Sequence, residues 1–357
     1  MVDIFGSFYK GKRVLVTGHT GFKGSWLSIW LHELGAEVVG VSLDPFSDRD
    51  NFVLSGIGKK IKADLRADIR DLTKMKSIFA EYKPEIVFHL AAQPLVRLSY
   101  DKPVETYETN VMGTINVLEA IRATDCVKVG VMITTDKCYD NKEQLRGYKE
   151  DDPFGGYDPY SSSKGACEIA IQSWRRSFFN PEQFDKHGKS IASVRAGNVI
   201  GGGDWALDRI IPDCIRALEA GKAIDIRSPQ SVRPWEHVLE PLSGYMLLAQ
   251  KMWTHPTEYC EGWNFGPETE SVSTVWEVAT ELVKNFGEGE LKDSSDANAV
   301  HEAKLLMLDI TKAKTQLGWK PRLNMQQCLA LVADWYKRYS SENVYELCVE
   351  EIEKFVG

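Results

Sequence analysis

The chain has 357 residues and a formal net charge of −8, with 43% hydrophobic and 26% charged residues. At ~150 residues per domain this length corresponds to about two domains, and the composition excludes disordered, collagen-like and coiled-coil proteins. The negative charge argues against a protein that coats nucleic acid. An anionic substrate would have to be bound by a few placed cations and backbone N–H groups.

The cysteines and the first residues predict a cytoplasmic protein. The seven cysteines are odd in number and scattered, without a CxxC pair or zinc spacing. We therefore expect reduced, mostly buried thiols and no metal. The initial MVDIFGSFYKGK lacks the apolar core of a signal peptide, and the sequence has no run of 18 apolar residues. Both observations argue against secretion and against a membrane span.

Apolar runs alternate with helical patterns through the first 200 residues. Strands are expected at residues 13–17, 37–41, 86–90, 127–134 and 190–195. Between the first two, Leu27 and the apolar residues at i+3, i+4 and i+7 form one helix face, and Gly35 would end that helix. Strands that alternate with helices predict an α/β protein with a Rossmann-type, doubly wound parallel sheet.

The pattern after residue 200 predicts a smaller, partly helical lobe. Helices are expected at residues 210–220, 239–252, 275–286 and 325–339, a polar loop at 287–298, and one strand at 262–265 that returns to the main sheet. We thus expect a cofactor-binding Rossmann domain over residues 1–200, with a returning segment around 235–268. The remainder, 201–357, would be a discontinuous substrate-binding lobe.

The sequence TGHTGFKG predicts a dinucleotide site, because it directly follows the first expected strand and opens the first helix. Glycines let a pyrophosphate approach the backbone, and the helix N-terminus supplies N–H groups. We predict that Gly18, Gly21 and Gly24 hold the pyrophosphate. His19 and Lys23 are bulky for such a loop, and we expect them to alter the fit of the cofactor.

Asp44 is the candidate for binding the adenosine ribose. An acidic residue near the end of the second strand holds the ribose and repels a 2′-phosphate. Asp44 lies 20 residues after Gly24, in a suitable place. The alternative interpretation is a turn residue before Pro45. The pattern therefore favours NAD over NADP.

Two short segments carry candidate catalytic groups. Tyr160 and Lys164 lie one helical turn apart in YSSSK, and a nearby ammonium would favour the phenolate over the phenol of pKa ~10. Tyr160 is thus a candidate base for an alcohol proton during hydride transfer. Thr135, Asp136 and Lys137 follow an expected strand, and ligands bind at strand carboxyl ends in such sheets. A surface ion pair of Asp136 with Lys137 is the alternative.

With these motifs the chain resembles the extended short-chain dehydrogenase/reductase family. The matching segments are TGHTGFKG, HLAAQ, TNVMGT, TTDK, YSSSK, VRAGNVIGGGDW, RPWEHV, WNFG and DITKAKTQLGWKP, which extend over nearly the whole chain. Within the family it looks most like the nucleotide-sugar 4,6-dehydratases, marked by an Asp and a base after the active-site Thr. Lys137 stands where most of them have Glu, as in the branch that acts on CDP-glucose.

The resemblance implies roles for the matching residues. The catalytic set is Thr135, Asp136, Lys137, Tyr160 and Lys164. The NAD-binding set is Gly18, His19, Gly21, Phe22, Lys23, Gly24, Asp44, Asp68, Ile69, Ala91, Ala92, Tyr160 and Lys164. The substrate-binding set is Asn110, Asn198, Arg209, Arg233 and Asn264. In this family the ribose-binding acid usually ends the second strand, where Ser42 stands here.

The implied reaction converts CDP-D-glucose to CDP-4-keto-6-deoxy-D-glucose and water, a step toward the deoxysugars of O-antigen and other surface polysaccharides. Tyr160 would take the O4 proton, and Asp136, kept protonated by burial, would protonate the leaving C6 hydroxide. Lys137 would either remove the C5 proton or remain charged and stabilise the enolate.

Relatives associate through two helices of the first domain, which implies a homodimer. Neither a nucleic acid nor a membrane partner is expected. The alternative functions are another nucleotide-sugar dehydratase or an epimerase of the same fold. A catalytically silent NAD-sensing module is a further alternative, although such modules lack the Tyr/Lys pair.

Overall fold

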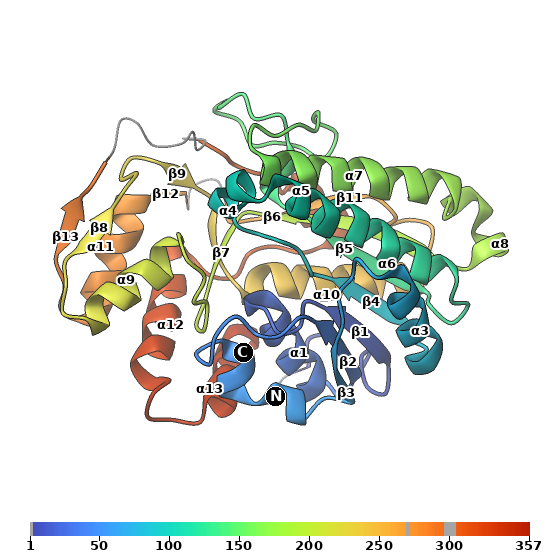
Figure 1. Cartoon of the computed structure of the whole chain (residues 1–357), viewed down its shortest axis with the longest axis horizontal. Helices are drawn as coiled ribbons and strands as arrows, with labels where there is room; N and C mark the ends of the chain where they lie inside the picture. Colours follow the sequence, from blue (N-terminus) through green and yellow to red (C-terminus); the bar gives the residue numbers. More distant parts are fainter. Residues whose placement is uncertain (1–2, 269–271, 296–304) are drawn as a thin grey trace.

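The computed structural model describes residues 3–268, 272–295 and 305–357. Its centre is a seven-stranded parallel sheet with the strand order β11-β6-β5-β4-β1-β2-β3 (Figure 1). The strands are β1 (Arg13–Thr17), β2 (Glu37–Ser42), β3 (Ala63–Arg66), β4 (Ile86–His89), β5 (Val129–Ile133), β6 (Ser190–Ala196) and β11 (Gly262–Phe265). This confirms the predicted Rossmann-type α/β fold.

Helices cover both faces of the sheet (Figure 1). One face packs against α1 (Phe22–Glu33) and α10 (Leu239–Thr254), and the other against α3 (Leu72–Tyr82), α6 (Gly113–Arg122) and α7 (Pro159–Ser177). Successive strand side chains point to opposite faces, so Val14 and Val16 join the first core and Leu15 joins the second. Burial on both faces explains why these strands read as continuous apolar runs.

In its described residues, the smaller lobe contains three two-stranded sheets and several helices. Its strand pairs are β7 (Asn198–Ile200) with β10 (Trp235–His237), β8 (Ile224–Ile226) with β13 (Leu291–Asp293), and β9 (Val232–Arg233) with β12 (Ser273–Thr274). Its helices are α9 (Ile210–Glu219), α11 (Val275–Phe286) and α12 (Met325–Arg338). The first domain also contains α2 (Asn51–Ser55), α4 (Val96–Asp101), α5 (Pro103–Tyr107) and α8 (Phe184–His187).

The chain passes between its two parts more than once. The segment that we expected to return to the sheet supplies α10 and β11, and β11 pairs with β6. The last helix, α13 (Val344–Val356), packs against α1 and α2. The chain thus begins and ends against the same face of the first domain.

Several elements differ from the sequence-based expectation, among them the short strands of the smaller lobe, which we did not predict. The prediction of a polar loop at 287–298 was wrong for Leu291–Asp293, which form β13 beside β8. Residues 296–298 lie outside the described part of the chain. We did not expect β3, whose side chains alternate between partly buried and exposed positions at the sheet edge, nor α13. Among the described residues, no helix is both long and apolar enough to cross a membrane.

Candidate active site

The glycine loop at the end of β1 is shaped by close backbone approaches. Gly18 has φ +74°, and a Cβ there would lie 2.7 Å from the Ala91 nitrogen. A Cβ on Gly24 would lie 2.1 Å from the Gly18 carbonyl oxygen. Helix α1 begins after Gly21 with no side-chain cap, so its first N–H groups are available to an anion. The loop therefore fits a dinucleotide pyrophosphate.

The His19 side chain turns away from this loop toward β2 and β3. Its Nε2 lies 2.7 Å from Oδ1 of Asp64, and its ring takes the space that a Cβ on Gly40 would need. Burial lowers the pKa of His19, while the hydrogen bond to Asp64 acts in the opposite direction. Since the residue is fully buried, only its backbone can reach the pyrophosphate that we expected it to contact.

The part of the expected NAD site that would hold the adenosine is more exposed than the glycine loop. Ser42, at the end of β2, shares a 2.7 Å hydrogen bond with the Thr20 hydroxyl. The Asp44 carboxylate is 87% exposed and accepts a 3.0 Å hydrogen bond from Nε of Arg66. Its contact with a ribose stays a prediction.

The proposed adenine cap follows β3. Asp68 pairs with Arg70, and the hydrogen bond from Arg70 lowers the pKa of Asp68. Ile69 is buried against Gly113, where a Cβ would lie 2.4 Å from its Cδ1. The side chain of Ile69 thus packs into the domain, and its contact with the adenine likewise stays a prediction.

The end of β5 places an acid in a buried position. Thr135 caps the short helix Asp136–Cys138, and its hydroxyl donates a 2.9 Å hydrogen bond to Oδ1 of Asp136. Asp136 is 1% exposed. Burial raises the pKa of its carboxyl, while the Lys137 charge and the Thr135 hydrogen bond oppose the rise. A carboxyl of this kind is suited to donate a proton.

Tyr160 and Lys164 approach the end of β5 from the first turns of α7. The phenol of Tyr160 is hydrogen-bonded to Thr135, and Nζ of Lys137 lies 6.0 Å from the Tyr160 ring centroid. Lys164 donates a 3.4 Å hydrogen bond to the carbonyl of Ile133. Burial raises the pKa of Tyr160 and the Thr135 bond only partly offsets it. Desolvation is thus the largest influence on this pKa, and our expectation that Lys164 lowers it stays a prediction.

Three of the five expected substrate-binding residues, Arg233, Arg209 and Asn198, lie on elements of the smaller lobe. Arg233 on β9 is buried, and its charge lowers the pKa of Asp136. Arg209, just before α9, forms a 2.8 Å ion pair with Asp204. Asn198 is partly buried at the start of β7. Two guanidinium groups near a buried acid suit an anionic diphosphate.

The other two, Asn110 and Asn264, have structural contacts instead. Asn264 is fully buried; it accepts from the Tyr139 hydroxyl and donates to the carbonyls of Tyr148 and Asp309. Asn110 is also buried, and its side chain bonds to both backbone groups of Gln93 and to Ser163. In both residues the two amide N–H groups are used within the protein and the amide oxygen accepts one hydrogen bond, so substrate binding by either residue stays a prediction.

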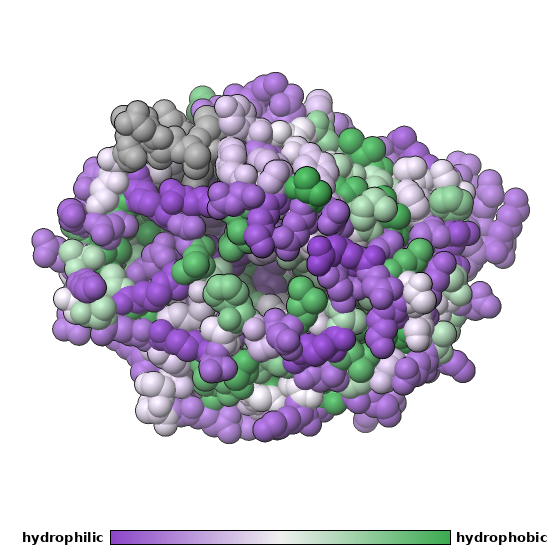
Figure 2. Space-filling view, in the orientation of Figure 1, coloured by the Kyte–Doolittle hydropathy of each residue, from purple (hydrophilic) through white to green (hydrophobic). Residues whose placement is uncertain are grey.

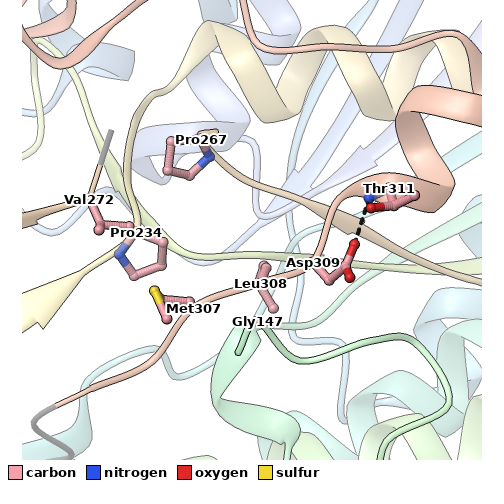
Figure 3. A pocket seen from close by; sticks show the side chains of 8 residues that line it. All are labelled: Gly147, Pro234, Pro267, Val272, Met307, Leu308, Asp309 and Thr311. Carbon is pink, nitrogen blue, oxygen red and sulfur yellow. Dashed lines mark hydrogen bonds between the residues drawn. The ribbon is translucent and has the colours of Figure 1, made fainter. Parts of the chain in front are cut away.

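Figure 2 shows a hollow near the middle of one face of the molecule, with hydrophilic residues at its base. A cavity of about 110 Å³ lies beside Pro234, lined also by Met307, Leu308 and Asp309 (Figure 3). In the figure the Asp309 carboxylate turns to the Thr311 N–H, at 2.8 Å. Since ligand sites usually enclose about 300 Å³ or more, this small cavity is not assigned to the sugar nucleotide.

Sequence reasoning missed Glu236 on β10. This residue is 3% exposed, and burial raises the pKa of its carboxyl. Its neighbours include Lys23, Asp136 and Tyr245, which come from three other elements. Glu236 lies between Trp235 and His237 in a short strand, and no sequence pattern there would have identified it as a functional residue.

Comparisons with known proteins identify relatives of this chain. The family model described as GDP-mannose 4,6 dehydratase matches residues 15–332. The chain is 51% identical to a CDP-glucose 4,6-dehydratase of Salmonella typhimurium, over 93% of this chain and 92% of that protein. It is 25% identical to dTDP-glucose 4,6-dehydratase 1 of Escherichia coli, over 91% and 92% of the two chains.

Among solved structures, a double mutant of a dTDP-glucose 4,6-dehydratase from Streptomyces venezuelae, with NAD and DAU bound, superimposes with a TM-score of 0.78. The identity is 21%, and the match covers 91% of this chain and 97% of that one. This likeness supports the fold. From the match of the family model to most of the sequence and the 51% identity, we conclude that the chain belongs to the GDP-mannose 4,6-dehydratase family, within the extended short-chain dehydrogenases/reductases.

Proposed function

We propose that this protein is an NAD-dependent CDP-glucose 4,6-dehydratase, a hydro-lyase that forms CDP-4-keto-6-deoxy-D-glucose. The observation that carries the proposal is the buried acid Asp136, held by Thr135 and followed by Lys137, within hydrogen-bonding reach of Tyr160 through Thr135. An epimerase needs the Tyr/Lys pair but no acid for a leaving hydroxide. The 51% identity to a CDP-glucose 4,6-dehydratase supports cytidine as the base.

NAD fits the loop at the end of β1. The close approaches at Gly18 and Gly24 leave room for a pyrophosphate against the backbone. Phe22 and Lys23 begin α1 and would border it, with Ala91 and Ala92 on the side of β4. Bound there, NAD would accept the hydride from C4 of the sugar and return it to C6.

The chain's own groups move the protons. Tyr160 takes the proton of the O4 hydroxyl, assisted by Thr135. Asp136 donates its proton to the C6 oxygen, which leaves as water. Lys137 either removes the C5 proton or stays charged and stabilises the enolate. Arg233 and Arg209 hold the diphosphate, since guanidinium groups bind phosphate oxygens in a fork, and Asn198 contacts the nucleotide sugar.

The test is incubation with CDP-glucose, dTDP-glucose and GDP-mannose, followed by mass spectrometry for the loss of one water. We expect a 4-keto-6-deoxy product from CDP-glucose at a rate at least ~100-fold above the others. In deuterated water the product should carry one deuterium at C5. Inversion at C4 without loss of water would instead establish an epimerase.

We further propose a homodimer that acts in the cytoplasm. Several large apolar side chains are exposed on neighbouring helices of the first domain (Figure 1): Val104, Tyr107, Met112, Ile169 and Phe178. Such a face is typical of an interface between copies. Sedimentation should give twice the monomer mass, and Val104→Lys with Ile169→Lys should give the monomer mass.

A further inference from the structure

A buried ion pair joins α7 to β6. Glu168 lies on α7, one helical turn after Lys164, and Arg195 lies near the end of β6. The Arg195 guanidinium donates hydrogen bonds of 2.9 Å and 3.0 Å to the two carboxylate oxygens of Glu168, and both side chains are at most 3% exposed. Such a fork of two parallel hydrogen bonds holds both groups in one arrangement.

The two members of this pair bind opposite ends of one short segment, residues 134–139, which we call the acid turn. At its start, the hydroxyl of Thr134 donates a hydrogen bond to the Glu168 carboxylate. At its end, the hydroxyl of Tyr139 accepts a hydrogen bond from the Arg195 guanidinium. Each end of the acid turn is therefore held by one of two charged groups that also hold each other.

The acid turn also packs closely against α7. A Cβ on Gly165 of α7 would lie 2.5 Å from the carbonyl oxygen of Gly155 and 3.2 Å from that of Cys138 in the turn. The middle of the turn carries Asp136, and the first turn of α7 carries Tyr160. The buried ion pair thus links the acid turn to the helix that carries the other half of the catalytic cluster.

We propose that Glu168 and Arg195 are positioning residues for the dehydration step. Through the hydroxyls of Thr134 and Tyr139 they hold the acid turn so that the Asp136 carboxyl reaches the C6 oxygen of the sugar. This rests on the proposed function. A shift of about 1 Å in a positioned group can lower a rate about 10²-fold. Loosening either end of the turn should therefore slow the loss of water, while substrate binding by the smaller lobe continues.

The experiment removes one hydroxyl at a time, in Thr134→Val and in Tyr139→Phe. It leaves the ion pair intact, because the loss of one partner of a buried pair is strongly destabilising. Single-turnover reactions with CDP-glucose follow oxidation at C4 by NADH absorbance and the loss of water by mass spectrometry. In both variants we expect dehydration to slow at least about tenfold, oxidation to slow less than about threefold, and KM to stay within about twofold. Thr134→Ser, which keeps the hydroxyl, should restore most of the dehydration rate.

Tyr9→Phe is the matched control. Tyr9 and Tyr139 are both 1% exposed, and the Tyr9 hydroxyl donates a 2.6 Å hydrogen bond to the carbonyl of Met246, outside the acid turn. The control thus loses a comparable buried hydrogen bond. A loss of stability reduces the amount of folded enzyme and hence the amplitude of a single turnover, but it does not change the ratio of the dehydration rate to the oxidation rate. That ratio should therefore equal the wild-type ratio in Tyr9→Phe.

Two results would overturn the proposal: a wild-type ratio of the two rates in Thr134→Val or in Tyr139→Phe, or an equal decrease of this ratio in Tyr9→Phe. A wild-type protein that releases no water from CDP-glucose would instead refute the proposed function. The two failures are therefore distinguishable in one set of reactions.

Discussion

The carboxyl ends of β1 and β5 carry two different kinds of site on one edge of the same sheet. The loop after β1 can approach a pyrophosphate closely because its glycines have no side chains: a Cβ on Gly24 would lie 2.1 Å from the Gly18 carbonyl oxygen. At β5 the site works because ionisable side chains are present and buried, above all Asp136. The first should therefore be damaged by added atoms, and the second by a lost proton or charge.

The largest effect is expected from Asp136→Asn. The amide keeps the acceptor for Thr135 but has no acidic proton, so formation of the dehydrated product should fall about 10³-fold. Oxidation at C4 should continue, seen as NADH absorbance on addition of CDP-glucose. Asp140→Asn, at a partly exposed carboxylate paired with Lys142, should stay within about twofold of wild type. A dehydration rate near normal in Asp136→Asn would remove Asp136 from the mechanism.

Lys137→Met distinguishes the two roles left for this residue. If Lys137 is the base, deuterium exchange at C5 should fall about 10²-fold while C4 oxidation remains. If it is an electrostatic stabiliser, exchange should continue at a reduced rate. Undiminished exchange would exclude it as the sole base. Lys142→Met, at a 71% exposed side chain, is the control.

In the loop after β1, the size of an added side chain alone should determine the loss of NAD binding and of stability. Gly24→Ala should weaken NAD binding at least tenfold and lower the free energy of unfolding by about 2–3 kcal/mol, since the new methyl group overlaps backbone. Gly21→Ala places its Cβ 3.3 Å from the Gly18 carbonyl oxygen, a mild contact, and should cost under about 1 kcal/mol. Equal losses in urea denaturation would contradict the steric account.

Asn264 and Arg233 should separate a structural from a substrate-binding role. Asn264→Ala removes three buried hydrogen bonds and should cost about 2–3 kcal/mol of unfolding free energy, with KM for CDP-glucose changed less than about twofold. Arg233→Lys keeps the charge but loses the fork, so KM should rise about tenfold. A large rise in KM for Asn264→Ala would instead support the predicted role of this residue in substrate binding.

The smallest effect concerns stability and pH. The pKa of Asp136 is raised in the folded protein, so the unfolded chain releases this proton at lower pH. The free energy of unfolding therefore decreases as the pH rises above the Asp136 pKa of the unfolded chain, about 3.9, and continues to decrease up to the raised pKa of the folded protein. Asp136→Asn should remove that loss and be more stable than wild type by about 1 kcal/mol at pH 8. Urea denaturation at pH 5 and pH 8 measures the difference; an equal slope in both proteins would contradict it.

Several features followed from the sequence alone because they depend on local pattern. Continuous apolar runs identified β1, β4, β5 and β6, since both faces of a parallel sheet are buried. Strand-then-glycine spacing located the cofactor loop, and the Tyr160 and Lys164 spacing located one side of the catalytic cluster. We did not predict the edge strand β3 because it is short and half polar. We also missed α13, although its apolar residues have helical spacing in the sequence.

Tertiary structure decided what depends on distance between remote residues. The contacts of Asn264 could be known only from the fold, because Tyr139, Tyr148 and Asp309 converge on it from separate segments. The side chain of His19 is directed to Asp64, 45 positions away. The raised pKa values of Asp136, Tyr160 and Glu236 come from desolvation. Sequence specified which groups are present; burial, which only the folded chain creates, decided which of them keep or lose a proton.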